Sequence, residues 1–291
     1  VAACGYNRSG RRPVGCGGVQ KRRTRRQSQP AEPAPFCFSR LAGRGWLSLN
    51  VGQKLMTNIY IPSKGPQDWQ ALLAEPDKHW RRGYSAMELA ECWEASDGFP
   101  AEVKLPLNQR FPGIRPLLAI PELKVPLPGG QRPSQNDIWV LARSDSSLVS
   151  IAVEGKVEEP FDRPVREWLA SGSVGKQERW NFLKRKLGLK EEPNGMLMYQ
   201  LFHRTASAII QAEEFRADCA VLVIHSFSEQ AAWFPEYSAF LRLFGVEALG
   251  GVLQSAVYST PIPLHFLWAT GTKKKEPNQS LDPTRFARGS S

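Results

Sequence analysis

A continuous apolar run at residues 219–224 (CAVLVI) most constrains the fold of this chain. Six apolar residues in a row, three of them β-branched, are typical of a strand buried on both faces, as in parallel sheets. The preceding segment, 197–215, carries apolar residues at helical spacing and predicts a helix that covers such a sheet. Together they indicate an α/β fold, in which a central mixed β-sheet is flanked by helices.

Shorter patterns predict the other elements. Ser85 and Glu88 have the spacing of a capping box and would begin one helix. Residues 99–116 are interrupted by prolines, show little period and are expected to form a loop. The expected helices are 66–73, 85–96, 176–187 and about 236–244; the expected strands are 117–125, 137–143, 148–154 and 264–269.

The basic charge of the chain is concentrated near its start. Residues 1–55 hold eleven Lys or Arg and one acid, whereas the remaining residues hold 27 of each sign. The run KRRTRR (21–26) could bind nucleic acid or direct nuclear import. We favour a disordered leader that precedes a native start at Met56, because the segment lacks any apolar period. One domain is expected at 56–270, with a disordered tail at 271–291.

Cysteine usage and hydropathy bear on the compartment. The five cysteines are odd in number and form no CxxC pair, which argues against a disulfide framework or a zinc ribbon. No run of 18 apolar residues occurs, so no membrane segment is expected. A reducing cytoplasm is the expected location.

The two strand patterns around SDSS (144–147) predict a β-hairpin whose polar residues could form a reactive site. If Arg143 pairs with Leu148, the same register places Asp137 opposite Glu154, and Lys156 lies on the same face as Glu154. Carboxylates that face each other repel and need a compensating cation. Mg²⁺ or Mn²⁺ takes such oxygen ligands. The alternative interpretation is a surface hairpin whose polar face carries three charges.

The motif of Asp137, sixteen residues, then Glu154-Gly155-Lys156 resembles the PD-(D/E)XK nuclease superfamily. The expected order of helix, three-strand meander, helix and strand is similar to the core of that restriction-endonuclease-like fold. The resemblance implies that Asp137, Glu154 and the carbonyl of Gly155 hold Mg²⁺ or Mn²⁺, while Lys156 orients or activates the attacking water. Gln200, in a YQL segment, is similar to a glutamine on the next helix of several branches.

The resemblance also implies an acid on the first core helix, a place that Glu94, or else Glu91 or Glu88, would take. Residues 56–270 look like an uncharacterised bacterial domain family of the same fold. The implied function is metal-dependent hydrolysis of phosphodiester bonds in DNA or RNA. A catalytically silent member that binds nucleic acid or a protein partner is the alternative.

Three further features have a functional and a structural interpretation. The basic residues of helix 176–187 could hold phosphates, although a solvated face is favoured. His225, at the end of the buried strand, is expected to be a hydrogen-bonded core residue. A polar stripe on helix 197–215 is expected to face solvent and comprises Gln200, His203, Arg204, Ser207 and Gln211.

Overall fold

The computed structural model describes residues 63–258 and 260–273. The predicted leader, the predicted start at Met56 and all but the first residues of the predicted tail lie outside these ranges. Among the described residues, no helix combines the length and the apolar character needed to cross a bilayer.

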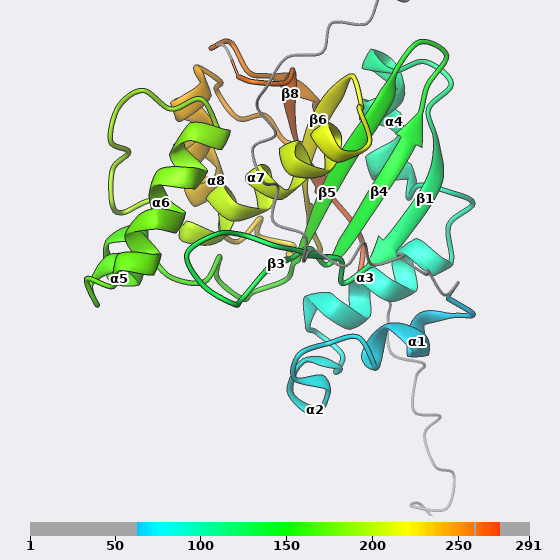
Figure 1. Cartoon of the computed structure of the whole chain (residues 1–291). Helices are drawn as coiled ribbons and strands as arrows, with labels where there is room; N and C mark the ends of the chain where they lie inside the picture. The colour runs from blue at the N-terminus through cyan, green and yellow to red at the C-terminus, as the bar shows by residue number, and fades with distance from the viewer. Residues whose placement is uncertain (1–62, 259, 274–291) are drawn as a thin grey trace, which may run out of the picture. The chain divides into compact units, whose positions relative to one another are not determined.

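A six-stranded mixed sheet forms the centre of the fold (Figure 1). Its strand order is β1-β4-β5-β6-β8-β7; the first three strands form an antiparallel meander, and β6 and β8 continue it in parallel. A separate ribbon pairs β2 with β3. The strands are β1 Arg115–Pro121, β2 Lys124–Val125, β3 Ser134–Gln135, β4 Ile138–Arg143, β5 Leu148–Lys156, β6 Cys219–Ser226, β7 Gln254–Ser255 and β8 Leu264–Thr270.

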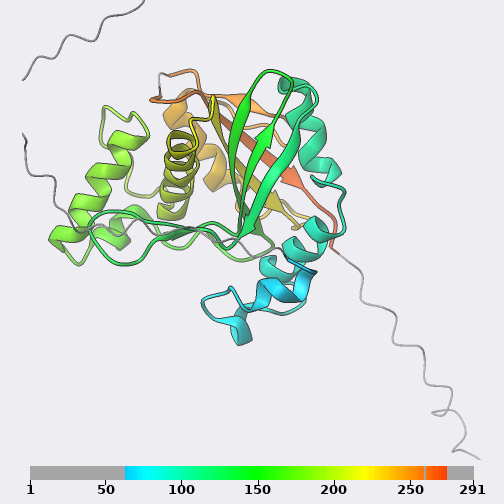
Figure 2. The same ribbon diagram turned by 45° about the vertical axis from the view of Figure 1, so that its right-hand side comes forward.

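Helices cover both faces of this sheet (Figure 2). Apolar residues of α5 to α8 pack on one face, and those of α1, α3 and α4 pack on the other. The helices are α1 Pro66–Gln70, α2 Pro76–His79, α3 Ser85–Glu94, α4 Ala101–Arg110, α5 Val165–Leu169, α6 Val174–Lys186, α7 Tyr199–Glu214, α8 Phe234–Leu241 and the 3₁₀ turn η1 Arg242–Phe244. The structure confirms the predicted α/β fold with a central mixed sheet between helices.

The central strands have the burial that their sequences predict. All eight residues of β6 are buried. In β5, Ala152 packs on the side of α7, whereas Ile151 and Val153 pack on the side of α3 and α4. The two faces of β5 therefore contribute to two separate apolar cores. The chain passes from β5 to the parallel strand β6 through α5, α6 and α7.

The prediction of a loop at 99–116 was wrong. Residues Ala101–Arg110 form α4, although Pro106 lies inside the helix. A proline there removes one i→i−4 hydrogen bond. Val103, Pro106 and Leu107 are buried, and burial of the three side chains against the sheet outweighs the missing bond.

Two other boundaries also differ from expectation. The expected strand 117–125 is interrupted at Glu122, whose φ of 53° ends β1 and turns the chain towards β2. The capping box at Ser85 is absent, because Tyr84 is the N-cap residue and Ser85 is the first residue of α3. The backbone N–H of Ser85 instead donates to Glu159 Oε1 at 3.1 Å.

Candidate active site

The β4–β5 hairpin has the register that the sequence predicts. Arg143 pairs with Leu148, and the antiparallel pairing continues to Ile138 and Val153. One further step along both strands places Asp137 opposite Glu154. The hairpin therefore brings Asp137 and Glu154 to the same end of the sheet, on the face that α7 covers.

Glu154 is held by two cations. Its carboxylate and the ammonium of Lys156 are both buried, each residue being 2% exposed. Lys156 Nζ donates to Glu154 Oε1 at 2.6 Å, and Arg204 Nε donates to Glu154 Oε2 at 2.5 Å. Burial alone would raise the pKa of Glu154, but Arg204 and Lys156 outweigh it and hold this pKa below its ordinary value. Glu154 is thus an ionised carboxylate with both oxygens bonded.

Arg204 links Glu154 to Asp137. Its Nη2 lies 3.7 Å from Asp137 Oδ1, and its Nη1 donates to Ser134 Oγ at 3.3 Å. The residue is only 7% exposed, and Ser207 on the same helix is fully buried. The prediction that this polar stripe faces solvent was therefore wrong for Arg204 and Ser207, because α7 turns them towards the sheet.

Asp137 lies against the backbone of the neighbouring strand. Its Oδ2 accepts a hydrogen bond from the N–H of Gly155 at 2.7 Å. A Cβ atom at Gly155 would lie 3.4 Å from this oxygen and 3.2 Å from the Cβ of Ser85. Glycine in the Glu-Gly-Lys triplet therefore allows both the carboxylate and α3 to approach β5 closely.

A third carboxylate, Glu122, completes a row across three strands. β1 pairs with β4 so that Pro121 faces Ile138, and the next residue, Glu122, donates its N–H to the Asp137 carbonyl at 3.0 Å. Its Oε2 accepts from Gln135 Nε2 at 2.7 Å. Neighbouring strands lie about 4.8 Å apart, so Glu122, Asp137 and Glu154 are brought close together. The sequence interpretation missed Glu122, and only the register of β1 with β4 could have revealed it.

Burial and mutual repulsion alter the protonation of this row. Burial, with the charge of Asp137 added to it, raises the pKa of Glu122 to about 8. Burial and the charge of Glu154 raise the pKa of Asp137 to about 7, although Arg204 and Lys156 oppose the rise. If all three carboxylates were ionised, the row would carry one more negative charge than Arg204 and Lys156 balance. At neutral pH, protonation of Glu122 and partial protonation of Asp137 relieve this repulsion.

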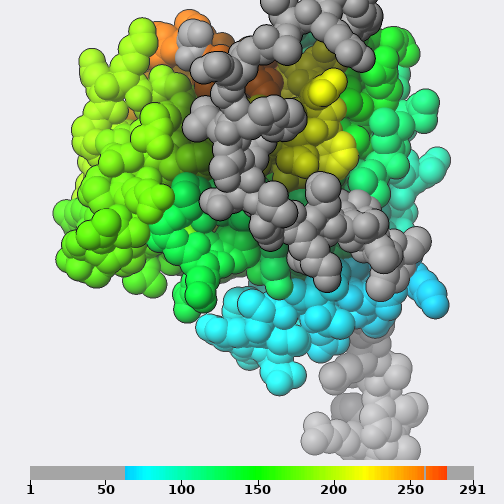
Figure 3. Space-filling model, in the orientation of Figure 1, coloured from blue at the N-terminus to red at the C-terminus, as the bar shows by residue number. Residues whose placement is uncertain are grey.

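The row opens into a cavity of about 580 Å³. Lys156, Gln200 and Arg204 line it together with the three carboxylates, and residues of α2 and the preceding turn form another wall. Figure 3 shows the blue and cyan surface of α1 and α2 below the green surface of the middle of the chain. Gln200 Oε1 is buried without a hydrogen-bond partner among the described residues. Four of the predicted residues, Asp137, Glu154, Lys156 and Gln200, thus meet in one cavity.

The acids of the first core helix are not brought to this cavity. Glu94 accepts from the Trp69 indole at 2.7 Å and from Ser63 Oγ at 2.5 Å. Glu91 pairs with Arg82, and Glu88 accepts from the N–H of Gly83 at 3.3 Å. Only Ser85 and Ala86 of α3 line the cavity. Glu122 lines the cavity, whereas Glu94 does not.

The donor set of the cavity suits a hard divalent cation. Glu122 and Asp137 supply carboxylate oxygens, and the unpartnered amide oxygen of Gln200 adds a neutral oxygen donor. Mg²⁺ and Mn²⁺ prefer these ligands. Positive charge would also relieve the repulsion that raises the pKa values of Glu122 and Asp137. Glu154 could join only if Lys156 or Arg204 released one of its oxygens.

A second cluster, Cys92, Glu102 and His225, does not have the chemistry of a metal centre. Ligand atoms of the three residues lie within 4.8 Å of one another. His225 Nδ1 accepts from the Trp93 indole at 3.1 Å, which places the ring proton on Nε2, and Nε2 lies 2.9 Å from Glu102 Oε1. Since a protonated nitrogen cannot bind a metal, His225 is the hydrogen-bonded core histidine that the sequence predicts.

The fold and the site define an α/β domain with a row of carboxylates at one end of its meander, of which Glu154 is buried and Glu122 and Asp137 are half-buried. Residues 62–273 match the family described as a domain of unknown function (DUF6946), and the chain belongs to this family. No curated protein and no solved structure matches the chain.

Proposed function

We propose that this domain hydrolyses phosphodiester bonds in nucleic acid with a divalent metal ion, as the PD-(D/E)XK nucleases do. The observation that carries the proposal is the convergence of Asp137, Glu154 and Lys156 in one cavity. Such a constellation is expensive to bury, and strongly perturbed carboxylates in a cleft favour a functional role over a structural one. The order of meander, α7 and β6 supports the same superfamily.

The residues have distinct roles in this proposal. Asp137 and the carbonyl of Gly155 would hold Mg²⁺ or Mn²⁺, and Glu154 would join them once Lys156 or Arg204 releases one of its oxygens. Glu122 and Gln200 would be further oxygen donors. The ion would supply Lewis-acid stabilisation of charge on a phosphoryl oxygen. Lys156 Nζ carries two protons beyond the one that it donates to Glu154, and it would orient the attacking water.

We further propose that the domain is located in the cytoplasm and that its substrate is DNA or RNA. The thiol state of Cys92 and Cys219 is compatible with a reducing compartment.

Calorimetry and a cleavage assay test the proposal on the same set of variants. Millimolar Mn²⁺ should raise the melting temperature of the wild-type protein, because an ion that binds only the folded state stabilises it by mass action. Asp137→Asn and Glu154→Gln should remove this rise and the cleavage of labelled DNA or RNA. Lys156→Met should retain most of the metal response and lose cleavage, since its role is with the water.

Asp145→Asn is the matched control, because Asp145 is an exposed acid in the loop at the other end of the same hairpin. It should behave as the wild type in both assays. A wild-type melting temperature that ignores Mn²⁺, together with no cleavage of single- or double-stranded substrates, would reject the nuclease function.

A silent binding module is the second candidate, and one observation favours it. Arg204 and Lys156 already bond both oxygens of Glu154, so buried cations occupy the positions around this carboxylate. In a silent domain the guanidinium of Arg204 would replace a metal permanently. Mn²⁺ would then leave the wild-type melting temperature unchanged but would stabilise Arg204→Met, in which Glu154 regains a free oxygen.

A further inference from the structure

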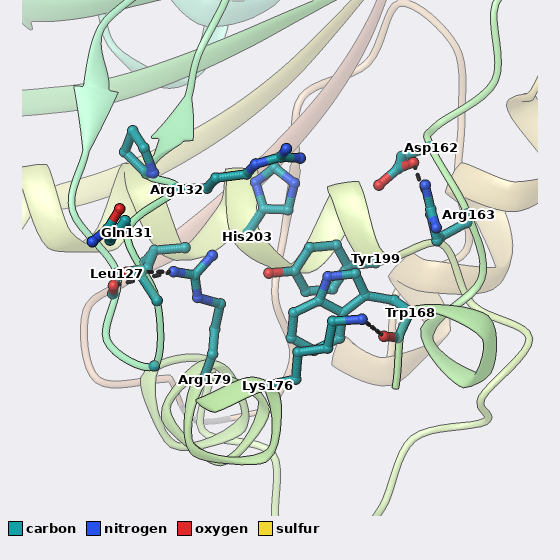
Figure 4. A pocket seen from close by; sticks show the side chains of 13 residues that line it. Leu127, Gln131, Arg132, Asp162, Arg163, Trp168, Lys176, Arg179, Tyr199 and His203 are labelled. Atoms are coloured by element: carbon teal, nitrogen blue, oxygen red, sulfur yellow. Dashed lines mark hydrogen bonds and ion pairs between the residues drawn. The ribbon is translucent and has the colours of Figure 1, made fainter. Parts of the chain in front are cut away.

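A second cavity, of about 440 Å³, lies next to the carboxylate cavity, along an adjacent face of α7. Figure 4 shows the side chains that line it. The loop between β2 and β3, the segment around α5, and the helices α6 and α7 surround it. Asp162 lines both cavities, and Tyr199 and His203 of α7 line this one. The two cavities are therefore neighbours that share one helix and one residue.

The loop that forms one wall is fixed in place by Arg179. This residue of α6 is 8% exposed. Its Nε donates to the Pro128 carbonyl at 2.8 Å, and its Nη2 donates to the carbonyls of Leu127 and Gly130 at 3.3 and 3.1 Å. Because this buried guanidinium donates to three backbone carbonyls, it holds the loop in one conformation and preorganises this wall of the cavity.

The cavity is strongly basic although the chain beyond residue 55 is neutral. Arg132, Arg163, Lys176 and Arg179 line it, against one carboxylate, Asp162. The carboxylate cavity has the opposite balance, with five acids and three Lys or Arg in its lining. Four cations around a small volume attract an anion with more than one charge.

Several of these donors remain available to a ligand. Arg132 is exposed and has no hydrogen-bond or ion-pair partner among the described residues. Lys176 Nζ donates to the Trp168 carbonyl at 2.6 Å, which leaves two of its three protons. Arg163 Nε is 3.4 Å from Asp162 Oδ1, a contact between two exposed side chains.

The aromatic residues favour recognition of a phosphate over recognition of a base. The rings of Trp168 and Tyr199 stack on each other, with centroids 3.9 Å apart and planes 10° apart. Lys176 Nζ lies 5.5 Å from the Trp168 ring, and the His203 ring lies 4.9 Å from that of Tyr199. Because neighbouring groups already cover these ring faces, the cavity offers charge and hydrogen-bond donors and little stacking surface.

We propose that this cavity binds a phosphate monoester, either the terminal phosphate of a nucleic-acid strand or the phosphate of a mononucleotide. The inference rests on the proposed function, in which a strand held by its end at Arg132 and Lys176 reaches across α7 to the carboxylates. A monoester dianion matches the excess of cations better than an internal diester with one charge.

Binding measured in EDTA tests this inference separately from cleavage. The full chain is titrated with a labelled oligonucleotide that ends in a phosphate or in a hydroxyl group, and with a nucleoside monophosphate as competitor. We expect the phosphorylated oligonucleotide to bind about ten-fold more tightly, as one charge-assisted contact provides. Any binding by the basic residues before 56 would be to the backbone phosphates that both oligonucleotides share, so it would cancel in the difference.

Two variants and one control test whether the phosphate binds in this cavity. Arg132→Ala and Lys176→Met should each abolish most of the preference for the phosphorylated end while leaving the melting temperature nearly unchanged. Arg185→Ala is the matched control, because Arg185 is an exposed cation of the same helix α6 that does not line the cavity. It should keep the preference.

The outcomes separate the two sources of the phosphate and the two proposals. The mononucleotide could compete although the protein shows no preference for phosphorylated ends. If Arg132→Ala then abolished this competition, the result would support a cavity that binds a free nucleotide. Equal binding of both oligonucleotides without such competition, or equal losses in Arg185→Ala, would overturn the inference. Phosphate binding without Mn²⁺-dependent cleavage would overturn only the nuclease function. Cleavage by a protein that binds neither the phosphorylated end nor the mononucleotide would overturn only this inference.

Discussion

His203 and Arg204 are consecutive residues of α7, yet their side chains line two cavities of opposite charge. Successive residues of an α-helix are rotated by about 100°, since a turn takes about 3.6 residues. One turn earlier, Tyr199 and Gln200 repeat the same division. A single helix thus positions both cavities, and a shift of α7 would alter the carboxylate row and the basic cavity together.

Glu122→Gln should stabilise the protein at neutral and alkaline pH. The folded state raises the pKa of Glu122 from its ordinary value of 4.5 to about 8, so the ionised form is destabilising. Below pH 4.5 the carboxyl is protonated in both states and the difference vanishes; it grows as the pH rises and is complete above about pH 8. We expect a gain of about 1–3 kcal/mol in the free energy of unfolding at pH 9.

Urea denaturation at several pH values measures this effect as the difference between variant and wild type. Other titrating groups cancel in this difference, because both proteins contain them. Glu178→Gln is the matched control, since Glu178 is an exposed acid of α6. Parallel stability curves for Glu122→Gln and wild type from pH 5 to pH 9 would show that Glu122 is ionised without cost in the folded protein.

Arg204→Met should be one of the most destabilising single substitutions in the domain. It leaves Glu154 buried with Lys156 as its only remaining partner in this contact and removes the cation next to Asp137. Breaking a buried ion pair by removing one partner costs about 3–5 kcal/mol. The double variant with Glu154→Gln should recover much of the loss, because no unpaired carboxylate then stays buried. Simple additivity of the two single effects in chemical denaturation would contradict the coupling.

The sequence could predict contacts within one hairpin but not contacts between strands that are far apart along the chain. The register of β4 with β5 follows from a four-residue loop and alternating side chains, so Asp137, Glu154 and Lys156 could be placed together from the sequence. Glu122 could not, because it depends on β1 pairing with β4, and a turn and the β2–β3 ribbon separate these strands along the chain.

Charged and proline residues misled the interpretation where packing overrides local preference. Arg204 lies in a polar stripe that is typical of a solvated face, and only the carboxylates across the sheet explain why it is buried. Pro106 is a helix breaker by local preference, yet α4 contains it because both neighbouring turns pack on the sheet. Neither outcome is encoded within one segment.

Gly129→Ala should detach the wall of the basic cavity from α6. Gly129 has a φ of 75°, and an added Cβ would lie 2.0 Å from the Gly175 carbonyl oxygen and 2.9 Å from Arg179 N, both backbone atoms. The loop must therefore move, and the hydrogen bonds from Arg179 to its carbonyls should be lost. We expect faster hydrogen exchange in residues 127–133 and weaker binding of phosphorylated oligonucleotides.

Gly172→Ala separates steric overlap from backbone strain in this experiment. Gly172 also has a positive φ, 63°, but nothing lies within 4 Å of its missing Cβ. Its substitution should cost only the left-handed strain, about 1 kcal/mol. Equal destabilisation by Gly129→Ala and Gly172→Ala, with unchanged exchange in the loop, would mean that the contact with Gly175 does not hold the loop.

Trp93→Phe should destabilise the contact between α3 and β6 by removing one hydrogen bond. His225 is fully buried, and the Trp93 indole is the donor to its Nδ1. An unsatisfied buried acceptor costs about 1–3 kcal/mol. Trp268→Phe is the matched control, because Trp268 is also buried but its indole N–H has no partner among the described residues. In the wild type, ¹⁵N NMR should show His225 protonated on Nε2, facing Glu102; a proton on Nδ1, or equal losses in both tryptophan variants, would contradict this arrangement and reopen the Cys92, Glu102 and His225 cluster as a metal site.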